Sequence, residues 1–464
     1  MSLKEKMLMF VGRKNEIKEV SEFLNSPQGL MILYGKRRIG KTALIKEVFN
    51  LRKEKYFYFQ CTKDTYEANT RAFVQELMLQ GYIKEDISGN KLSDIFYILN
   101  FVCPNVNIVI DEYTYLFNST SRNIVDSDLQ KINDNYLLSR HLILTGSELS
   151  LMKDLEKENN PLFGRVKLKL SLKELNYLEA SEFYSNKTPY EKVAFYSVFG
   201  GSPFVNRLIN KELSLKENII NLCLNPNSEV YSYVTELLFS NLSDSYSVNR
   251  LLSYIKNGKK RNSEIERALN FEKNGGLNKK IKTLIDIELL TKNAPINKEN
   301  DDKKVRYEIK DNIVKFFYTF VLSNVSSLNV ISPENYYEIL IDSDNRLGNF
   351  LSKGFEQIVR QYIVIKAKEG VFKDVIKVGS YYYDDPKNKV NGEFDIAILK
   401  INQKYSIGEV KYYNNHKLSV LEMYNETEQI KRINEIEIDE IFFVSTLFEE
   451  NNKYKCYSIE KLYE

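Results

Sequence analysis

Residues 33–44, LYGKRRIGKTAL, contain the pattern G-x-x-x-x-G-K-[ST] without a gap. Gly35 and Gly40 allow the backbone to curl so that its N–H groups point at phosphates, and the helix that starts near Lys41 adds its positive N-terminal end. Lys41 is expected to reach the β- and γ-phosphates, and the Thr42 hydroxyl is expected to bind Mg²⁺. The apolar run GLMILYG comes before the loop and GKTALIKEVFN follows it, which gives the order strand, loop, helix. The motif therefore predicts a parallel α/β sheet that binds a nucleoside triphosphate.

The predicted contacts with ATP fill the loop and the first helical turn. They are Gly35, Lys36, Arg37, Arg38, Ile39, Gly40, Lys41, Thr42 and Ala43. Mg²⁺ is the expected cofactor, with Thr42 and Asp111 as its predicted ligands.

An acidic pair follows another apolar run, NIVIDE, about 70 residues after the phosphate loop. Asp111 is expected to hold the metal through water, and Glu112 to polarise the attacking water. Such a pair is usually only a solvated strand end, but its position after a phosphate loop favours the functional interpretation. In LILTGS, Thr145 and Ser147 end a further strand, where they would sense the γ-phosphate.

Composition limits the class of protein. The 464 residues are too many for one ordinary core, so two to four domains are expected. Hydrophobic residues make up 43% and charged residues 28%, as in soluble globular proteins. The sequence shows no membrane-spanning run and no secretory signal, which predicts a cytoplasmic protein without a membrane partner. Its four cysteines form no C-x-x-C pair and it has only two histidines, so chemistry is expected to depend on carboxylates, lysine, arginine and bound metal.

The hydrophobic periodicity predicts four regions. Residues 1–172 form a P-loop ATPase core, because short apolar strands alternate with helical patterns. Residues 173–244 have helical periodicity and form a lid. Residues 245–330 read as helix, turn, helix and two strands, the outline of a winged helix-turn-helix. Residues 345–464 form a second α/β domain with a long helix, three strands, a helix and a last strand.

The N-terminal half resembles a known family. FVGRKNEI, the phosphate loop, IVIDE, LILTGS, PLFGRVKL and GGSPF occur in the order seen in archaeal-type ATPases, which belong to the AAA+ superfamily near the STAND ATPases. The resemblance implies that Gly12 and Arg13 lie near the adenine and ribose, and that Pro203 packs on the adenine. Arg165 falls where AAA+ proteins often have an arginine finger, although a surface arginine before a strand is an equal alternative. A finger would come from a neighbouring subunit, so a homo-oligomer is one possible assembly.

The C-terminal region contains a second pattern of charged residues in GEFDIAI and SIGEVKYY. Strand alternation predicts one polar and one apolar face in the first of these strands. The predicted polar face holds Glu393, Asp395 and Ala397, and the other face holds Phe394, Ile396 and Ile398.

A tight hairpin would bring these two strands together. Asp395 would then meet Glu409 and Lys411, and Glu356 on the preceding helix would lie against the same patch. Two close carboxylates repel each other unless a cation binds between them, so Asp395 and Glu409 are predicted ligands of Mg²⁺ or Mn²⁺. Lys411 would help to deprotonate a water or neutralise charge in the transition state.

This cluster resembles the PD-(D/E)xK nuclease superfamily, which has a restriction-endonuclease-like fold. By that resemblance Asp395 is the strand aspartate, Glu409 and Lys411 are the E-x-K motif, and Glu356 is the helix-borne acid. The region also resembles the nuclease-like domain of unknown function that follows many archaeal-type ATPases. The proline before the aspartate is absent, and the chain has no tryptophan where that domain commonly has several.

The predicted winged helix suits duplex DNA. LNKKIKTL would enter the major groove, NKENDDKK would form the wing, and Lys279, Lys280 and Lys282 would contact phosphates. Winged helices also dock proteins, so this alternative stays open.

Two functions are therefore predicted. The first is an ATP-dependent enzyme acting on DNA, in which ATP gates a metal-dependent nuclease at Asp395, Glu409 and Lys411. The second is a nucleotide-controlled switch of the STAND type, whose C-terminal domain only binds DNA or a protein partner.

Overall fold

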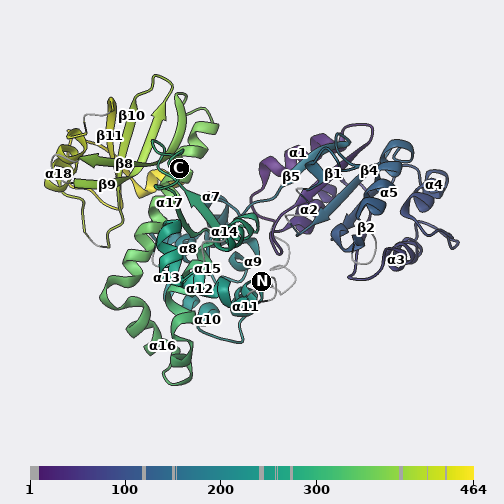
Figure 1. Cartoon of the computed structure of the whole chain (residues 1–464), viewed down its shortest axis with the longest axis horizontal. Coiled ribbons are helices and arrows are strands. Elements are labelled where there is room, and N and C mark those ends of the chain that lie inside the picture. The colour runs from purple at the N-terminus through teal and green to yellow at the C-terminus, as the bar shows by residue number, and fades with distance from the viewer. Residues whose placement is uncertain are drawn as a thin grey trace. The chain divides into compact units, whose positions relative to one another are not determined.

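A computed structural model describes residues 10–117, 122–148, 152, 154–239, 245–256, 258, 260–271, 275–385, 390–414, 416–433 and 436–464 of the chain. The chain divides into two compact units, Met1–Glu174 and Leu175–Glu464, which are drawn together in Figure 1. Each unit has its own sheet and its own hydrophobic core.

Unit 1 contains a five-stranded parallel sheet in the order β2-β3-β4-β1-β5. Each strand lies in a segment that the sequence predicts as a strand. The last of them lies in GRVKLKLSL, which alternates between apolar and polar residues and is not an apolar run. The strands are β1 (Gly29–Tyr34), β2 (Tyr56–Gln60), β3 (Asn107–Asp111), β4 (His141–Gly146) and β5 (Val166–Ser171). The central strands are buried along nearly their whole length, because helices cover both faces of the sheet.

Strand alternation divides the core of unit 1 into two layers. Leu30 and Ile32 of β1 point into one hydrophobic cluster, and Met31 and Leu33 point into the other. The first layer is closed by α3 (Tyr66–Leu79), α4 (Leu92–Val102) and α5 (Arg122–Asn135). The second is closed by α1 (Lys14–Leu24) and α2 (Lys41–Arg52). The sheet is therefore fixed from both sides, and its carboxyl edge carries the loops that follow β1, β3 and β4.

Unit 2 begins with a helical region. It comprises α7 (Tyr177–Ser181), α8 (Pro189–Phe199), α9 (Pro203–Asn206), α10 (Leu215–Cys223), α11 (Glu229–Phe239) and α12 (Ser245–Ile255). Thr188 and Ser214 form capping boxes with Glu191 and Glu217, which satisfy the first backbone N–H groups of α8 and α10. Helices therefore fill most of residues 173–239, as the helical periodicity predicts, and residues 240–244 of the predicted segment lie outside the described residues.

Two helices and a two-stranded antiparallel sheet come next. They are α13 (Asn262–Leu269), α14 (Gly276–Asp286), β6 (Leu290–Asn293) and β7 (Arg306–Ile309). Leu277, Ile281 and Leu284 of α14 are buried, whereas Lys279 and Lys282 on its other face are exposed. Shorter helices follow, α15 (Asn312–Phe316) and α16 (Pro333–Tyr336), with 3-10 and π turns between them.

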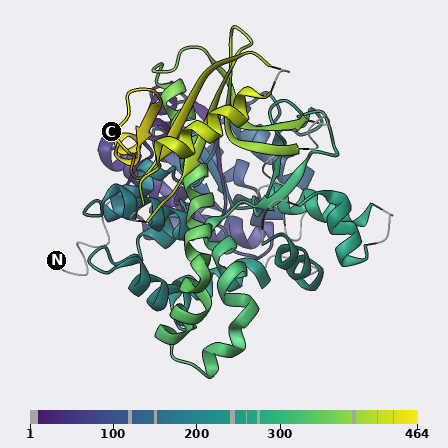
Figure 2. The same cartoon turned by 90° about the vertical axis from the view of Figure 1, so that its left-hand side faces the viewer.

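The C-terminal part of unit 2 is a mixed five-stranded sheet in the order β12-β11-β10-β9-β8. The strands are β8 (Val375–Asp385), β9 (Val390–Lys400), β10 (Tyr405–Lys411), β11 (Ile438–Ser445) and β12 (Lys455–Ser458). The first three pair antiparallel and the last three pair parallel. The long helix α17 (Arg346–Lys368) packs on one face, and α18 (Val420–Lys431) lies across the other, as Figure 2 shows.

A bulge in β9 overturns the predicted alternation of its side chains. Gly379 pairs with Ala397 and Tyr381 pairs with Phe394, so β9 advances by three residues where β8 advances by two. Because the extra residue breaks the period of two, Phe394 packs in the same cluster as Ala397, while Ile396 packs with α17. The prediction that Phe394 shares a face with Ile396 is wrong for this reason.

The loop between β6 and β7, residues 294–305, docks on β8. The N–H of Ile296 donates to Ser380 O at 2.8 Å. The side-chain amide of Asn297 donates to Tyr382 O and accepts from the N–H of Tyr382. Lys304 lies 3.6 Å from the centre of the Tyr382 ring. These contacts cover the outer edge of β8, which is the last strand of its sheet. The segment predicted as the wing is thus held by the C-terminal sheet.

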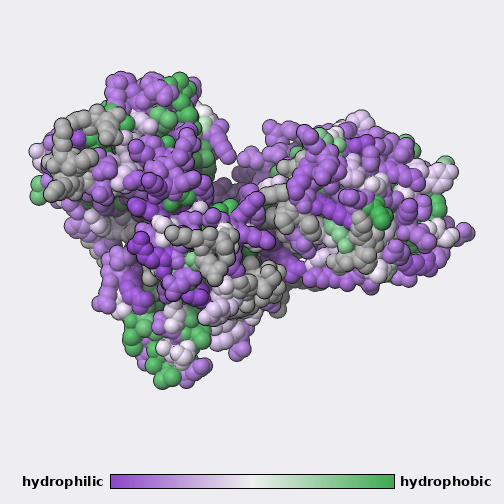
Figure 3. Space-filling model, viewed as in Figure 1, coloured by the Kyte–Doolittle hydropathy of each residue, from purple (hydrophilic) through white to green (hydrophobic). Residues whose placement is uncertain are grey.

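Hydrophilic side chains cover most of the face in view in Figure 3. Within the described ranges, no helix combines the length and the apolar character needed to cross a membrane.

Candidate nucleotide site and C-terminal carboxylate cluster

The phosphate loop of unit 1 holds its lysine in a buried, preformed position. Lys41 Nζ donates to Gly35 O at 3.0 Å and to Lys36 O at 3.2 Å. Burial lowers the pKa of Lys41, and the carboxylates of Glu112 and Asp111 oppose that shift. The ammonium therefore faces two acids and two carbonyls at the carboxyl edge of the sheet, where a phosphate can replace the carbonyls.

Glycine is required at both ends of the loop. Gly40, which precedes α2, has φ 95°, a backbone conformation that residues with a side chain rarely adopt. A Cβ on Gly35 would lie 2.6 Å from Leu172 O, closer than packing permits. The loop is thus folded tightly between β1 and the end of β5.

Asp111 is the centre of a hydrogen-bond network at the end of β3. Thr42 Oγ1 donates to Asp111 Oδ2 at 3.0 Å, and the hydroxyls of Thr145 and Tyr58 also donate to this carboxylate. The structure therefore brings together three predicted residues from α2, β3 and β4. A hydroxyl beside a carboxylate is the oxygen donor set that suits Mg²⁺, so the residues fit the predicted cation.

Tyr58 is a member of this network that the sequence analysis missed. It lies on β2, which pairs with β3 in parallel. Burial and Asp111 raise its pKa above the usual value for tyrosine. Its alternating position in KYFYFQ is a signal for an inward-facing polar group, but only the strand order shows that it meets Asp111.

Glu112 follows Asp111 in a left-handed backbone conformation, with φ 51°. Its carboxylate accepts the Ser147 hydroxyl at 2.8 Å and the Ser147 N–H at 3.2 Å. A non-glycine residue in this conformation is uncommon and costs free energy, so surrounding contacts must hold it. Glu112, which is expected to polarise water, and Ser147, which is expected to sense phosphate, are therefore hydrogen-bonded to each other.

Residues 173 and 174, at the end of unit 1, contact the phosphate loop and the residues beside it. Lys36 Nζ is 3.1 Å from a carboxylate oxygen of Glu174. Arg13 is buried and donates to the carbonyls of Ile39 and Lys173. Gly12 and Arg13 both have positive φ, which forms the tight entry into α1. The loop is thus bonded to residues 173 and 174, where unit 1 ends.

The structure also gives the positions of three other residues that the sequence analysis predicts to contact the nucleotide. Arg37 donates to Tyr115 OH at 2.6 Å. Arg165 binds Asp134 of α5 at 2.9 Å and is partly exposed. Pro203 is the first residue of α9 in unit 2. The roles predicted for Arg165 and Pro203 stay predictions.

In unit 2, Glu409 and Lys411 of β10 form an ion pair of 2.7 Å. Burial and the nearby Asp395 carboxylate raise the pKa of Glu409 to about 7. Burial alone would lower the pKa of Lys411, but the carboxylates of Glu409 and Glu426 outweigh it and raise that pKa. Three predicted residues are therefore coupled electrostatically, as the hairpin of β9 and β10 requires.

Glu426 of α18 is an additional member of this cluster, 3.4 Å from Lys411 Nζ. The sequence analysis missed it because only the packing of α18 on the sheet brings it to β10. Glu356 lies on α17 and pairs with Arg360 at 3.5 Å. Arg360 also donates to the backbone carbonyl of Asp395 at 2.9 Å, which links α17 to the strand aspartate.

Glu393, also on β9, pairs with Arg306 of β7 at 3.5 Å. In the part of the chain that the structure describes, no group of three or more His, Cys, Asp and Glu side chains is arranged to hold a metal ion.

Comparison with known proteins gives matches in both units. Residues 10–205 match a family described as an ATPase domain predominantly from Archaea. Residues 317–433 match a family of archaeal and bacterial proteins of unknown function. The predicted order, an archaeal-type ATPase domain followed by a domain of unknown function, is confirmed.

Individual relatives are more distant. An uncharacterized protein of Methanocaldococcus jannaschii is 27% identical over 427 residues, which cover 90% of this chain and 91% of that protein. The solved Walker-type ATPase of Pyrococcus abyssi is 19% identical, with 67% of this chain and 96% of that chain covered and a TM-score of 0.49. The ORC1 protein of Aeropyrum pernix, solved in complex with DNA, is 14% identical, with 69% and 95% covered and a TM-score of 0.34.

Proposed function

We propose that unit 1, which carries most of the archaeal-type ATPase match, binds ATP with Mg²⁺ and hydrolyses it. The observation that carries this proposal is the meeting of Lys41, Thr42 and Asp111 at the carboxyl edge of a parallel sheet. Lys41 would exchange its carbonyl partners for phosphate oxygens, and Thr42 and Asp111 would hold the cation. Bound Mg²⁺ would neutralise the charge that develops on the phosphates.

Glu112 would orient the attacking water and accept its proton. Its carboxylate is bonded to Ser147, which would keep it at one position until a phosphate binds between them. The N–H groups at the start of α2 would bind the phosphate oxygens, because the first turn of a helix has no internal partners for them.

ATP binding and turnover by the full chain test this proposal. Lys41→Ala is expected to weaken ATP binding strongly, because Lys41 is the residue expected to reach the β- and γ-phosphates, whereas Lys36 of the same loop pairs with Glu174. Glu112→Gln is expected to retain binding and to lower the rate of hydrolysis about 100-fold or more, as loss of a general base does. Lys55→Ala, an exposed lysine before β2, is the matched control and should behave as the wild type. Equal turnover in all four proteins would refute the proposal.

We further propose that this ATPase acts on DNA and gates a metal-dependent nuclease in unit 2. The supporting observation is the coupling of Asp395, Glu409 and Lys411, since a carboxylate pair beside a lysine suits phosphodiester hydrolysis. Asp395 and Glu409 would hold Mg²⁺ or Mn²⁺, and Lys411 would act on the water. Glu356 of α17 would support the site indirectly, because its partner Arg360 donates to the backbone carbonyl of Asp395. The cation would supply a Lewis acid at the scissile phosphate.

The helices α13 and α14 with β6 and β7 would form a winged helix that contacts duplex DNA. Exposed Lys279 and Lys282, with Lys280 beside them, would bind phosphates. Gating would start at the phosphate loop, which is bonded to residues 173 and 174 at the end of unit 1. A change at Lys36 or Arg13 on nucleotide binding would therefore be passed to the segment that leads into unit 2.

The second candidate is a nucleotide-controlled switch of the STAND type, in which unit 2 binds DNA or a protein without cutting. The ion pairs that already engage Lys411 with Glu409 and Glu426 favour this reading. Cleavage of plasmid and single-stranded DNA, with Mg²⁺ or Mn²⁺ and with or without ATP, separates the two. Loss of cutting in Lys411→Ala, with an altered ATP response in Lys41→Ala, supports the nuclease. ATP turnover without cutting under any metal supports the switch.

A further inference from the structure

The C-terminal sheet contains a cavity of about 190 Å³ on the face that packs against α17. Val359 and Ile363 of α17 line one side, and Ile398, Phe442 and Val444 of the sheet line the other. An engineered cavity of about 150 Å³ is known to hold a benzene ring, so this volume suits one or two fused rings.

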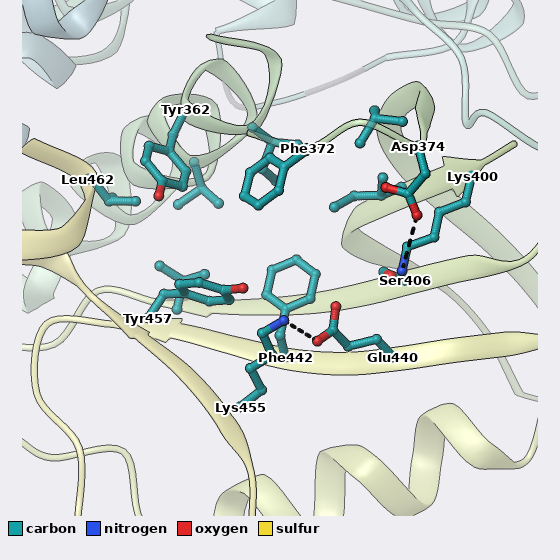
Figure 4. Close-up of a pocket in the computed structure, with 15 residues that line it drawn as sticks. Tyr362, Phe372, Asp374, Lys400, Ser406, Glu440, Phe442, Lys455, Tyr457 and Leu462 are labelled. Carbon is teal, nitrogen blue, oxygen red and sulfur yellow. Dashed lines mark ion pairs between the residues drawn. The ribbon is translucent and has the colours of Figure 1, made fainter. Parts of the chain in front are cut away.

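Two aromatic pairs face each other across the cavity (Figure 4). Tyr362 and Phe372 meet edge to face, with ring centres 6.3 Å apart, and Phe442 and Tyr457 do the same at 5.8 Å. Phe372 and Tyr457 are only half-buried, whereas Tyr362 and Phe442 are buried. The cavity is therefore a slot with aromatic walls that opens toward solvent beside Phe372 and Tyr457, a shape that favours a planar molecule.

Ser406 of β10 supplies an unsatisfied polar group to this slot. The residue is 1% exposed and lines the cavity, and its Oγ has no hydrogen-bond partner among the described residues. A buried hydroxyl without a partner is unfavourable, and most such groups in folded proteins are paired. A ligand atom that bonds to Ser406 Oγ would remove this cost.

The charged groups at the cavity are already paired. Lys400 lies 3.8 Å from Asp374 and also pairs with Asp439, and Lys455 pairs with Glu440. Figure 4 shows the ion pair of Lys400 with Asp374 and the ion pair of Lys455 with Glu440. The two lysines and two carboxylates that line the cavity balance in charge, so its lining provides no net charge to attract a charged ligand.

We propose that this cavity binds a neutral planar heteroaromatic molecule of one or two rings, held between the aromatic pairs and hydrogen-bonded to Ser406 Oγ. The site is separate from the carboxylate cluster. Ser406 faces α17, whereas its neighbour Ile407 packs with Ile430 of α18, and Glu409 has the same orientation as Ile407. The inference therefore does not depend on nuclease activity.

Binding of two matched probes to the full chain tests the site. Quinoline and naphthalene have the same fused-ring shape, but only quinoline carries a ring nitrogen that accepts a hydrogen bond. Saturable binding, measured by ligand-observed NMR, is expected for both, with quinoline about 10-fold tighter, the value of one buried hydrogen bond. Binding of neither probe, or equal affinity for both, would overturn the proposal.

Variants assign the binding to this cavity. Ser406→Ala is expected to weaken quinoline binding about 10-fold and to leave naphthalene unchanged. Ser445→Ala is the matched control, because Ser445 Oγ is also buried without a partner among the described residues but does not line the cavity. Val359→Phe fills the cavity and should abolish binding of both probes. Thermal unfolding would verify that each variant is folded, and a folded Val359→Phe protein that binds like the wild type would refute the site.

Discussion

The raised pKa of Glu409 makes the stability of the C-terminal sheet depend on pH. Folding shifts this pKa from 4.5 to about 7, because burial and Asp395 disfavour the charged carboxylate. As pH rises from about 4.5, the unfolded chain releases the Glu409 proton while the folded sheet still retains it. The sheet therefore loses stability between pH 4.5 and 7, and above pH 7 the loss is complete.

The size of the effect follows from the two pKa values. Between pH 5 and pH 8 the linked loss is about 2.5 kcal/mol, a factor of about 70 in the equilibrium for local opening. Glu409→Gln has nearly the same shape but no titrating group, so it should lack this dependence. Lys411 remains protonated throughout the range, because its pKa is raised, and adds nothing to the slope.

Hydrogen exchange of the full chain, read on peptides that cover β10, measures the opening equilibrium at each pH. Wild-type protection, corrected for intrinsic exchange, is expected to fall about 70-fold relative to Glu409→Gln between pH 5 and pH 8. Peptides from β1 in unit 1 serve as an internal control. Parallel profiles for the two proteins, or wild-type protection that rises with pH, would contradict the electrostatic argument.

Three further predictions concern the other contacts described. Thr42→Val removes the hydroxyl that donates to Asp111, so Mg²⁺ should no longer tighten ATP binding, while ATP binding without metal persists. Titration of the protein with ATP, in Mg²⁺ and in a chelator, measures this difference. Gly35→Ala forces a Cβ to within 2.6 Å of Leu172 O and is expected to destabilise unit 1 by about 1–3 kcal/mol. The melting temperature of the variant should therefore be lower than that of the wild type, and an unchanged melting temperature would refute the argument from crowding. Asn297→Ala removes both bonds to the Tyr382 backbone, about 2 kcal/mol, and should speed exchange in residues 294–305 about 10-fold or more; unchanged exchange would show that the loop is not held there.

Much of unit 1 is predictable from sequence. Most of its strands are short apolar runs, and a parallel sheet collects their carboxyl ends at one edge. Residues that directly follow such runs, Asp111 and Thr145 among them, therefore meet beside the phosphate loop. The loop itself is local, so its glycines and Lys41 could be assigned from spacing alone.

The C-terminal cluster was only partly predictable. Glu409 and Lys411 share a strand, and their proximity follows from the period of two. The bulge between Phe394 and Ala397, however, shifts the register of β9 against β8, and the sequence GEFDIAI does not reveal where an extra residue will be inserted.

Other features arise only from the tertiary structure. Tyr58 meets Asp111, Glu426 meets Lys411 and the β6–β7 loop covers β8 because elements distant in sequence pack together. The hydroxyl of Ser406, which has no hydrogen-bond partner among the described residues, is likewise a property of the space between α17 and the sheet. Sequence determines local conformation and which face of an element is apolar. It does not state which elements pack together or in which register, since that choice depends on the burial and hydrogen bonding of the whole unit.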